Sequence, residues 1–72
     1  MKHTWTWDET VITEQAFRAD KKLSRELAEE IGVPLGSLRW KYGNCKALRG
    51  EGNATHISKM HRQVFDELNR RE

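Results

Sequence analysis

The sequence predicts a small all-α domain of three to four helices that contains a helix-turn-helix motif. Apolar residues recur at spacings of three and four, no segment alternates with a period of two, and clusters of Gly, Pro and Asn divide the chain into four stretches. The 72 residues are 36% apolar and 33% charged, which is too apolar for a disordered chain and too interrupted for a membrane span. We therefore expect residues 1–72 to form one folded domain.

The first helix is expected to start at Thr6. Thr6-Trp7-Asp8-Glu9 fits a capping box, in which the Thr6 hydroxyl and the Glu9 carboxylate each accept a hydrogen bond from a free backbone amide. The apolar spacing predicts an inward stripe made of Val11, Ile12, Ala16 and Ala19.

The second helix is expected to end at Gly32, which suits the left-handed position that follows a helix C-terminus. Its apolar side carries Leu23, Leu27, Ala28 and Ile31. Its other side is acidic through Glu26, Glu29 and Glu30.

The third helix starts after Pro34 and carries Leu38, Tyr42 and Cys45 on one face. Gly43 and Asn44 offer a place to stop, but an interior glycine costs only about 1 kcal/mol. We favour a helix that continues through Leu48.

The last helix is predicted to be capped by Ser58 and to end near two arginines that suit its negative end. The residues expected to face inward are Met60, Val64, Phe65 and Leu68.

Basic charge is concentrated in the second half of the chain. Residues 1–36 hold five Lys/Arg and seven Asp/Glu (5 − 7 = −2), whereas residues 37–72 hold eight and four (8 − 4 = +4). Residues 37–62 alone hold six basic residues against Glu51 (6 − 1 = +5). Such a stretch suits a polyanion, although a solvated basic face without a ligand is an equally common explanation.

Residues 27–38 have the spacing of a helix-turn-helix. Ala28 is small where the next helix must cross closely, Gly32 makes the turn, Val33 fills the corner and Leu38 anchors the second helix. A plain helical hairpin is the alternative, and the basic third helix favours the DNA-binding motif.

Two resemblances to known families follow from these residues. Gly32-Val33-Pro34-Leu35-Gly36-Ser37-Leu38-Arg39 resembles the helix-turn-helix of sigma-factor region four. A looser pattern over residues 31–68 is similar to the small helical domain that precedes HNH nuclease domains in bacterial restriction-like proteins. Its matching positions are Gly32, Ser37, Leu38, Lys41, Asn44, Leu48, Gly52, Ser58, Lys59, Arg62 and Val64.

Both resemblances imply DNA handling. The chain departs from the second family at Cys45, where the family has Phe, and at Arg49, where it has Asp. The chain has no His-Asn-His constellation, no nucleophile with a base and no phosphate loop, so we do not expect an enzyme or a cofactor.

The side of the third helix opposite Leu38 is the candidate DNA surface. At about 100° per residue, this side carries Gly36, Arg39, Trp40, Gly43 and Ala47. Arg39 is the expected base reader, since Arg can bind a guanine edge bidentately. The expected phosphate contacts are Ser37, Lys41, Lys46 and Arg49, with the segment from Arg49 to Lys59 acting as a clamp.

Trp40 has three possible roles: packing under Trp5 and Trp7, contacting a dimer partner, or stacking on DNA. Packing is the commoner outcome for an aromatic side chain, and we favour a place in the core or in an interface over a contact with DNA. His56 and His61 are five residues apart, which does not align two ligands on one helix, so we expect surface histidines and no metal site.

These observations predict a small phage-type or bacterial transcriptional regulator that binds duplex DNA through its third helix. One short recognition helix buries little surface, so useful specificity requires a homodimer, a tandem site or a protein partner. The alternative is a protein-interaction module that docks through Trp40 and the flat Gly36/Gly43 face. A single cysteine and the absence of a signal peptide favour the reducing cytoplasm, and neither a membrane nor a small-molecule substrate is expected.

Overall fold

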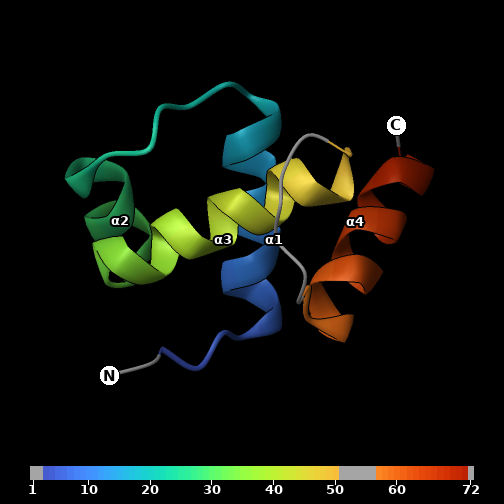
Figure 1. Cartoon of the computed structure of the whole chain (residues 1–72), viewed down its shortest axis with the longest axis horizontal. Coiled ribbons are helices and arrows are strands. Elements are labelled where there is room, and N and C mark those ends of the chain that lie inside the picture. The colour runs from blue at the N-terminus through green and yellow to red at the C-terminus, as the bar shows by residue number, and fades with distance from the viewer. Residues whose placement is uncertain (1–2, 51–56, 72) are drawn as a thin grey trace.

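The computed structural model describes residues 3–50 and 57–71, which form four α-helices and no strand (Figure 1). The helices are α1 (Trp7–Arg18), α2 (Arg25–Ile31), α3 (Leu35–Leu48) and α4 (Lys59–Arg71). The predicted all-α architecture is confirmed. Within these described ranges, none of the helices has both the length and the apolar character of a membrane span.

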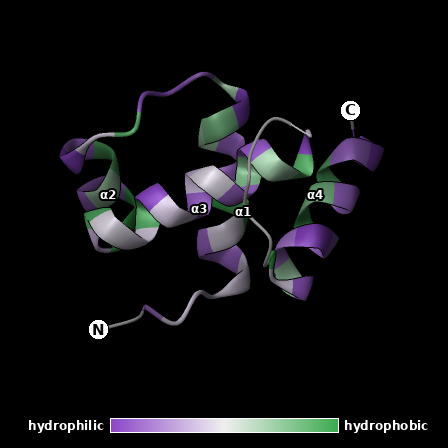
Figure 2. Ribbon diagram, viewed as in Figure 1, coloured by the Kyte–Doolittle hydropathy of each residue, from purple (hydrophilic) through white to green (hydrophobic). Residues whose placement is uncertain are grey.

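The helix α1 is the centre of the fold and packs against the other three helices. In Figure 1, α3 crosses α1, with α2 at one end of α3 and α4 near the other. Hydrophobic, neutral and hydrophilic residues are interleaved along α3 (Figure 2), as expected for a helix with one buried and one exposed side. The arrangement leaves the outer side of α3 open.

Helix ends follow the local sequence closely. The Thr6 hydroxyl accepts from the Glu9 amide and the Glu9 carboxylate accepts from the Thr6 amide, so the predicted capping box is present. Gly32 ends α2 at φ +89°, and its amide donates to the Ala28 carbonyl at 2.8 Å. Ser58 accepts from the His61 amide at 3.1 Å, as predicted for the start of α4.

The third helix continues through Gly43 to Leu48, as predicted. Pro34 is the residue that immediately precedes the helix, and its carbonyl accepts from the Leu38 amide at 3.0 Å. Val33 fills the corner between α2 and α3 and is buried. The two helices are thus joined by a tight turn with a buried apolar residue at its corner, and the helix-turn-helix motif itself stays a prediction.

An apolar core lies between α1, α2 and α3. Its buried members are Ala16, Leu27, Ala28, Val33, Leu38 and Tyr42. Trp5 packs against this core, whereas Trp7 is 39% exposed. Phe17 meets Tyr42 edge to face at 5.3 Å between ring centroids, which fixes α1 against α3.

The predicted inward stripe of α1 is confirmed at Ala16, which is buried, and Val11 is half-buried, but the prediction is wrong at Ile12 and Ala19. Ile12 is 47% exposed and Ala19 is exposed, whereas α1 buries Thr10, Thr13 and Glu14. Thr10 donates its hydroxyl hydrogen to the Thr6 carbonyl at 2.8 Å, and Glu14 has partners on α3 and α4. Thr10 and Glu14 are thus satisfied inside, whereas the buried Thr13 hydroxyl has no hydrogen-bond partner among the described residues, and α1 turns a polar side toward its neighbours.

The fourth helix buries Val64 and Leu68 as predicted, and Met60 and Phe65 are half-buried. His61, expected on the surface, is completely buried. Its Nε2 atom lies 3.3 Å from Glu14 Oε1, so the interaction with Glu14 accounts for its position.

Candidate nucleic-acid interface

The outer side of α3 presents a stripe of exposed and small residues along the helix. Gly36, Arg39 and Lys46 are exposed, and Trp40 is 64% exposed. Gly43 lies between them and is half-buried. Of the three roles expected for Trp40, packing into the core is therefore wrong, because Leu38, Tyr42 and Cys45 occupy the buried side of the helix, whereas an interface or a DNA contact stays a prediction.

Gly36 and Gly43 are not required by the packing of the chain itself. A Cβ atom added at either position would meet no atom within 4 Å. A glycine inside a helix is less favourable than alanine by about 1 kcal/mol, so both residues weaken α3 without filling a tight space. Packing within the described residues therefore does not explain either glycine.

A groove of about 370 Å³ runs beside this stripe, between α3 and the residues that follow α1. Its lining residues are Phe17, Asp20, Lys21, Leu23, Arg39, Tyr42, Gly43 and Lys46. The Tyr42 hydroxyl donates to the Lys21 carbonyl at 2.9 Å, which ties this connection to α3. The groove therefore brings Lys21 to the same surface as Arg39 and Lys46.

Lys21 was not among the residues singled out from the sequence. In the sequence, the run Asp20-Lys21-Lys22 lies where the apolar pattern of the first helix weakens, and nothing in it points to the third helix. Its approach to α3 depends on the fold, because Arg39 is 18 positions further along the chain (39 − 21).

Lys41, expected at a phosphate, is buried instead. Only 3% of the residue is exposed, and its ammonium group lies 4.9 Å above the centre of the Trp5 ring. Burial lowers the pKa of this side chain. Position 41 is three residues after Leu38 and so shares its buried side, which removes Lys41 from the candidate surface.

Arg49, also expected at a phosphate, is directed into the protein. Its guanidinium donates to Glu14 Oε2 at 2.6 Å and to the Cys45 carbonyl at 2.9 Å. It also lies over the Phe17 ring at 4.7 Å. Through these contacts Arg49 connects α1 to the end of α3. It is therefore not part of the candidate surface.

The two remaining predicted contacts take different positions. Ser37 is half-buried in the first turn of α3. Lys59 is exposed at the start of α4. The predicted clamp between Arg49 and Lys59 falls largely on residues 51–56, which lie outside the described residues.

Beneath this surface, Glu14 is the centre of a buried polar cluster. Its Oε2 atom accepts from Arg18 Nε and from Arg49, each at 2.6 Å. Burial alone would raise the pKa of Glu14, but hydrogen bonds from His61, Arg49 and Arg18 lower it to about 2. The carboxylate is therefore ionised at neutral pH.

Cys45 completes this cluster, with its Sγ atom 3.6 Å from His61 Nε2. Burial and the negative charge of Glu14 raise the pKa of the Cys45 thiol to about 12. In a catalytic triad the nucleophile and the carboxylate contact opposite ring nitrogens of the histidine, whereas here both lie at Nε2. The arrangement is not that of a catalytic triad.

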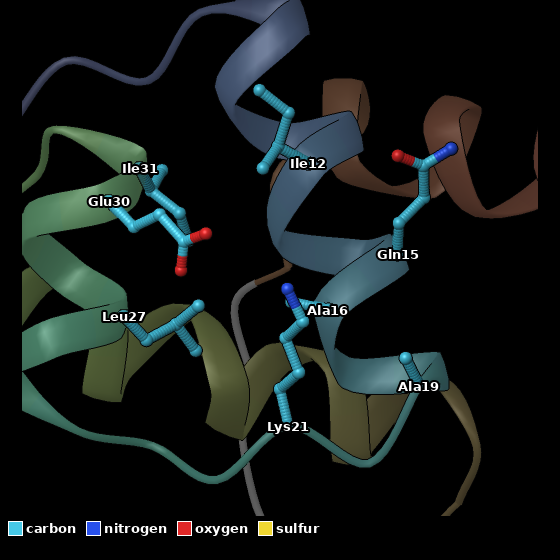
Figure 3. Close-up of a pocket in the computed structure, with 8 residues that line it drawn as sticks. All are labelled: Ile12, Gln15, Ala16, Ala19, Lys21, Leu27, Glu30 and Ile31. Atoms are coloured by element: carbon cyan, nitrogen blue, oxygen red, sulfur yellow. The ribbon is translucent and has the colours of Figure 1, made fainter.

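A second groove, of about 450 Å³, lies between α1 and α2 (Figure 3). Its walls are mostly apolar and include the exposed Ile12 together with Ala16, Leu27 and Ile31. Figure 3 shows the Lys21 side chain extending past Ala16 and the Glu30 carboxylate pointing into the gap. The residues that were expected to form the inner stripe of α1 thus contribute to an open surface.

No protein-family model, curated protein or solved structure matches the chain. The resemblances to sigma-factor region four and to the domain that precedes HNH nucleases therefore stay predictions.

Proposed function

We propose that the protein binds duplex DNA through the outer side of α3. The contact surface consists of Gly36, Arg39, Trp40, Gly43 and Lys46 on α3, with Lys21 beside them. Transcriptional regulation is the process that such a small binder would serve.

The observation that carries this proposal is the flat stripe at Gly36 and Gly43. Neither glycine is needed for internal packing, and both reduce the stability of the helix. A helix that enters a major groove approaches base edges and backbone closely, which favours positions without side chains between the contact residues.

The charges on this surface support the same function. Arg39 is exposed and forked, which suits bidentate hydrogen bonds to a guanine edge. Lys46 and Lys21 suit phosphates, whose contacts position the protein without reading sequence. Lys41 and Arg49 are excluded because they are engaged inside the protein.

The experiment is a fluorescence anisotropy titration of a labelled duplex. If Lys21 and Lys46 neutralise two phosphates, raising the salt from about 50 to 200 mM should weaken binding roughly twelvefold. Lys46→Ala should weaken binding to all duplexes and lower the salt slope by about one, whereas Arg39→Ala should also reduce the preference among sequences.

The matched control is Arg70→Ala, which removes an exposed arginine near the end of α4. It changes the net charge by the same amount but leaves α3 intact. Equal weakening by Lys46→Ala and Arg70→Ala would show that binding follows net charge alone. The assignment to α3 would then be wrong.

A protein-interaction module is the second candidate, and the exposure of Trp40 favours it. A tryptophan that is 64% exposed beside two flat positions resembles the aromatic anchors of protein interfaces. Salt distinguishes the two functions, because an apolar interface centred on Trp40 responds far less to ionic strength than phosphate contacts do. No duplex binding at low salt would favour this candidate.

A further inference from the structure

Three side chains with metal-ligating atoms meet where α1, α3 and α4 come together. They are Glu14, Cys45 and His61, and all three are completely buried. One carboxylate oxygen, the Cys45 sulfur and one His61 nitrogen all lie within 4.8 Å of one another. Each ligand comes from a different helix, so the fold itself assembles the group.

Two of the three distances between these atoms match those around a tetrahedral zinc ion, and the third is at most 4.8 Å. Zinc bonds are about 2.0–2.1 Å to nitrogen or oxygen and about 2.3 Å to sulfur. At tetrahedral angles, these lengths place nitrogen and oxygen ligands about 3.3 Å apart and nitrogen and sulfur ligands about 3.6 Å apart. His61 Nε2 lies 3.3 Å from Glu14 Oε1 and 3.6 Å from Cys45 Sγ.

The two oxygens of Glu14 have different partners. Oε2 accepts the hydrogen bonds from Arg18 and Arg49, whereas Oε1 faces His61. The guanidinium groups hold the carboxylate in one orientation, as hydrogen bonds to metal-binding carboxylates commonly do. Oε1 is therefore the oxygen directed toward the point between the three ligands.

His61 Nε2 faces two neighbours but carries at most one hydrogen. It can donate fully to Glu14 Oε1 or to Cys45 Sγ, but not to both. A cation between the three atoms would satisfy the nitrogen, the oxygen and the sulfur together. Thiolate, imidazole and carboxylate are all established ligand types for zinc.

We propose that Glu14 Oε1, Cys45 Sγ and His61 Nε2 bind one Zn²⁺ ion. When zinc binds, Cys45 gives up its thiol proton to solvent and forms the Zn–S bond, His61 contributes the Nε2 lone pair, and a water molecule supplies a fourth ligand. One double positive charge enters and one proton leaves, so the charge of the cluster rises by one. The ion would join α4 to α1 and α3, and this proposal does not depend on DNA binding.

The test is a titration of the full chain with Co²⁺, which substitutes for zinc and has visible absorption bands. We expect one cobalt ion per chain, an intense tetrahedral spectrum and a sulfur-to-cobalt charge-transfer band, all of which are lost when Zn²⁺ is added. Cys45→Ser should abolish the charge-transfer band. His61→Asn should weaken metal binding at least tenfold, while His3→Asn, at a histidine outside the cluster, should not change it.

A second measurement uses only the unmodified chain and so does not depend on whether a variant folds. The midpoint of thermal unfolding of the unmodified chain is compared in Zn²⁺ and in a chelator, and zinc should raise it. The proposal is overturned if cobalt gives no charge-transfer band, or if Cys45→Ser and His61→Asn bind metal like the parent. It is also overturned if zinc leaves the unfolding midpoint unchanged.

Discussion

The Glu14 carboxylate and the Arg49 guanidinium meet at 2.6 Å, although 35 positions separate them in the chain. The Glu14 side chain is completely buried, and Arg18 donates to the same oxygen. This contact explains both the polar inner side of α1 and the absence of Arg49 from the outer surface.

Replacing Glu14 with Gln should destabilise the protein strongly. The substitution keeps the size of the side chain but leaves the guanidinium groups of Arg18 and Arg49 without their shared negative charge. Removing one partner of a buried ion pair lowers the free energy of unfolding by about 3 kcal/mol. Urea unfolding in the presence of a chelator would measure this loss.

The matched control is Glu67→Gln on the surface of α4. Glu67 accepts from Arg71 at 3.0 Å, and both side chains are largely exposed. This change should cost less than about 0.5 kcal/mol. Similar losses for the two variants would show that the Glu14 cluster adds no more stability than a surface pair.

The capping box at Glu9 makes the stability of the fold depend on pH in the acid range. The Thr6 amide and the His3 ring lower the pKa of Glu9 below its usual value of 4.5. A lowered pKa means that Glu9 stabilises the fold above pH 4.5 and that this contribution is lost as the pH falls through the lowered value.

Glu9→Gln should remove part of the dependence of stability on pH, because the glutamine side chain does not titrate. The glutamine oxygen can still accept a hydrogen bond from the Thr6 amide. Thermal unfolding of both proteins between about pH 7 and pH 3 would measure the effect. The difference between their midpoints should narrow as the pH falls. A constant difference over this range would contradict the prediction.

Features of the fold that depend on neighbouring residues were accessible from the sequence. Thr6, Gly32 and Ser58 cap helices through hydrogen bonds that span only a few positions, and all three predictions are confirmed. The continuation of α3 through Gly43 also follows from local preferences.

Features that depend on distant partners were not accessible in this way. Apolar periodicity assigns Glu14 to the surface, because a pattern of neighbouring residues carries no information about distant partners. The partners of Glu14 are Arg49 and His61, which lie 35 and 47 positions further along the chain. For the same reason, a charge count places Lys41 and Arg49 on the basic face and overlooks Lys21. Arg39 was found because the helical period turns it away from Leu38, whereas Lys46 was found from its charge in the basic part of the chain.

Gly43→Ala should change stability and DNA binding in opposite directions. A Cβ atom at this position meets nothing within 4 Å, so the substitution should stabilise the free protein by about 1 kcal/mol. The same methyl group would stand on the flat stripe and should weaken duplex binding. Urea unfolding would measure the stability of the variant, and the anisotropy titration would measure its affinity for the duplex, both on the same preparation.

Gly32→Ala provides the contrast, because Gly32 has φ +89° and alanine is strained there. It should destabilise the protein by about 1 kcal/mol and leave the affinity of the folded protein unchanged. If Gly43→Ala stabilised the fold and bound DNA like the parent, the flat stripe would not be part of the interface.

Asp20 should oppose DNA binding, because it is the only acidic side chain among the residues that line the groove with Lys21, Arg39 and Lys46. Its backbone has φ +59°, a conformation that asparagine also tolerates. Asp20→Asn should therefore keep the fold and strengthen duplex binding by about twofold at low salt, with a smaller gain as salt screens the charge.

Asp66→Asn on the exposed side of α4 makes the same change in net charge. A gain at position 20 but not at position 66 would locate the DNA at the groove beside α3, whereas equal gains would reflect net charge and leave the groove without a role.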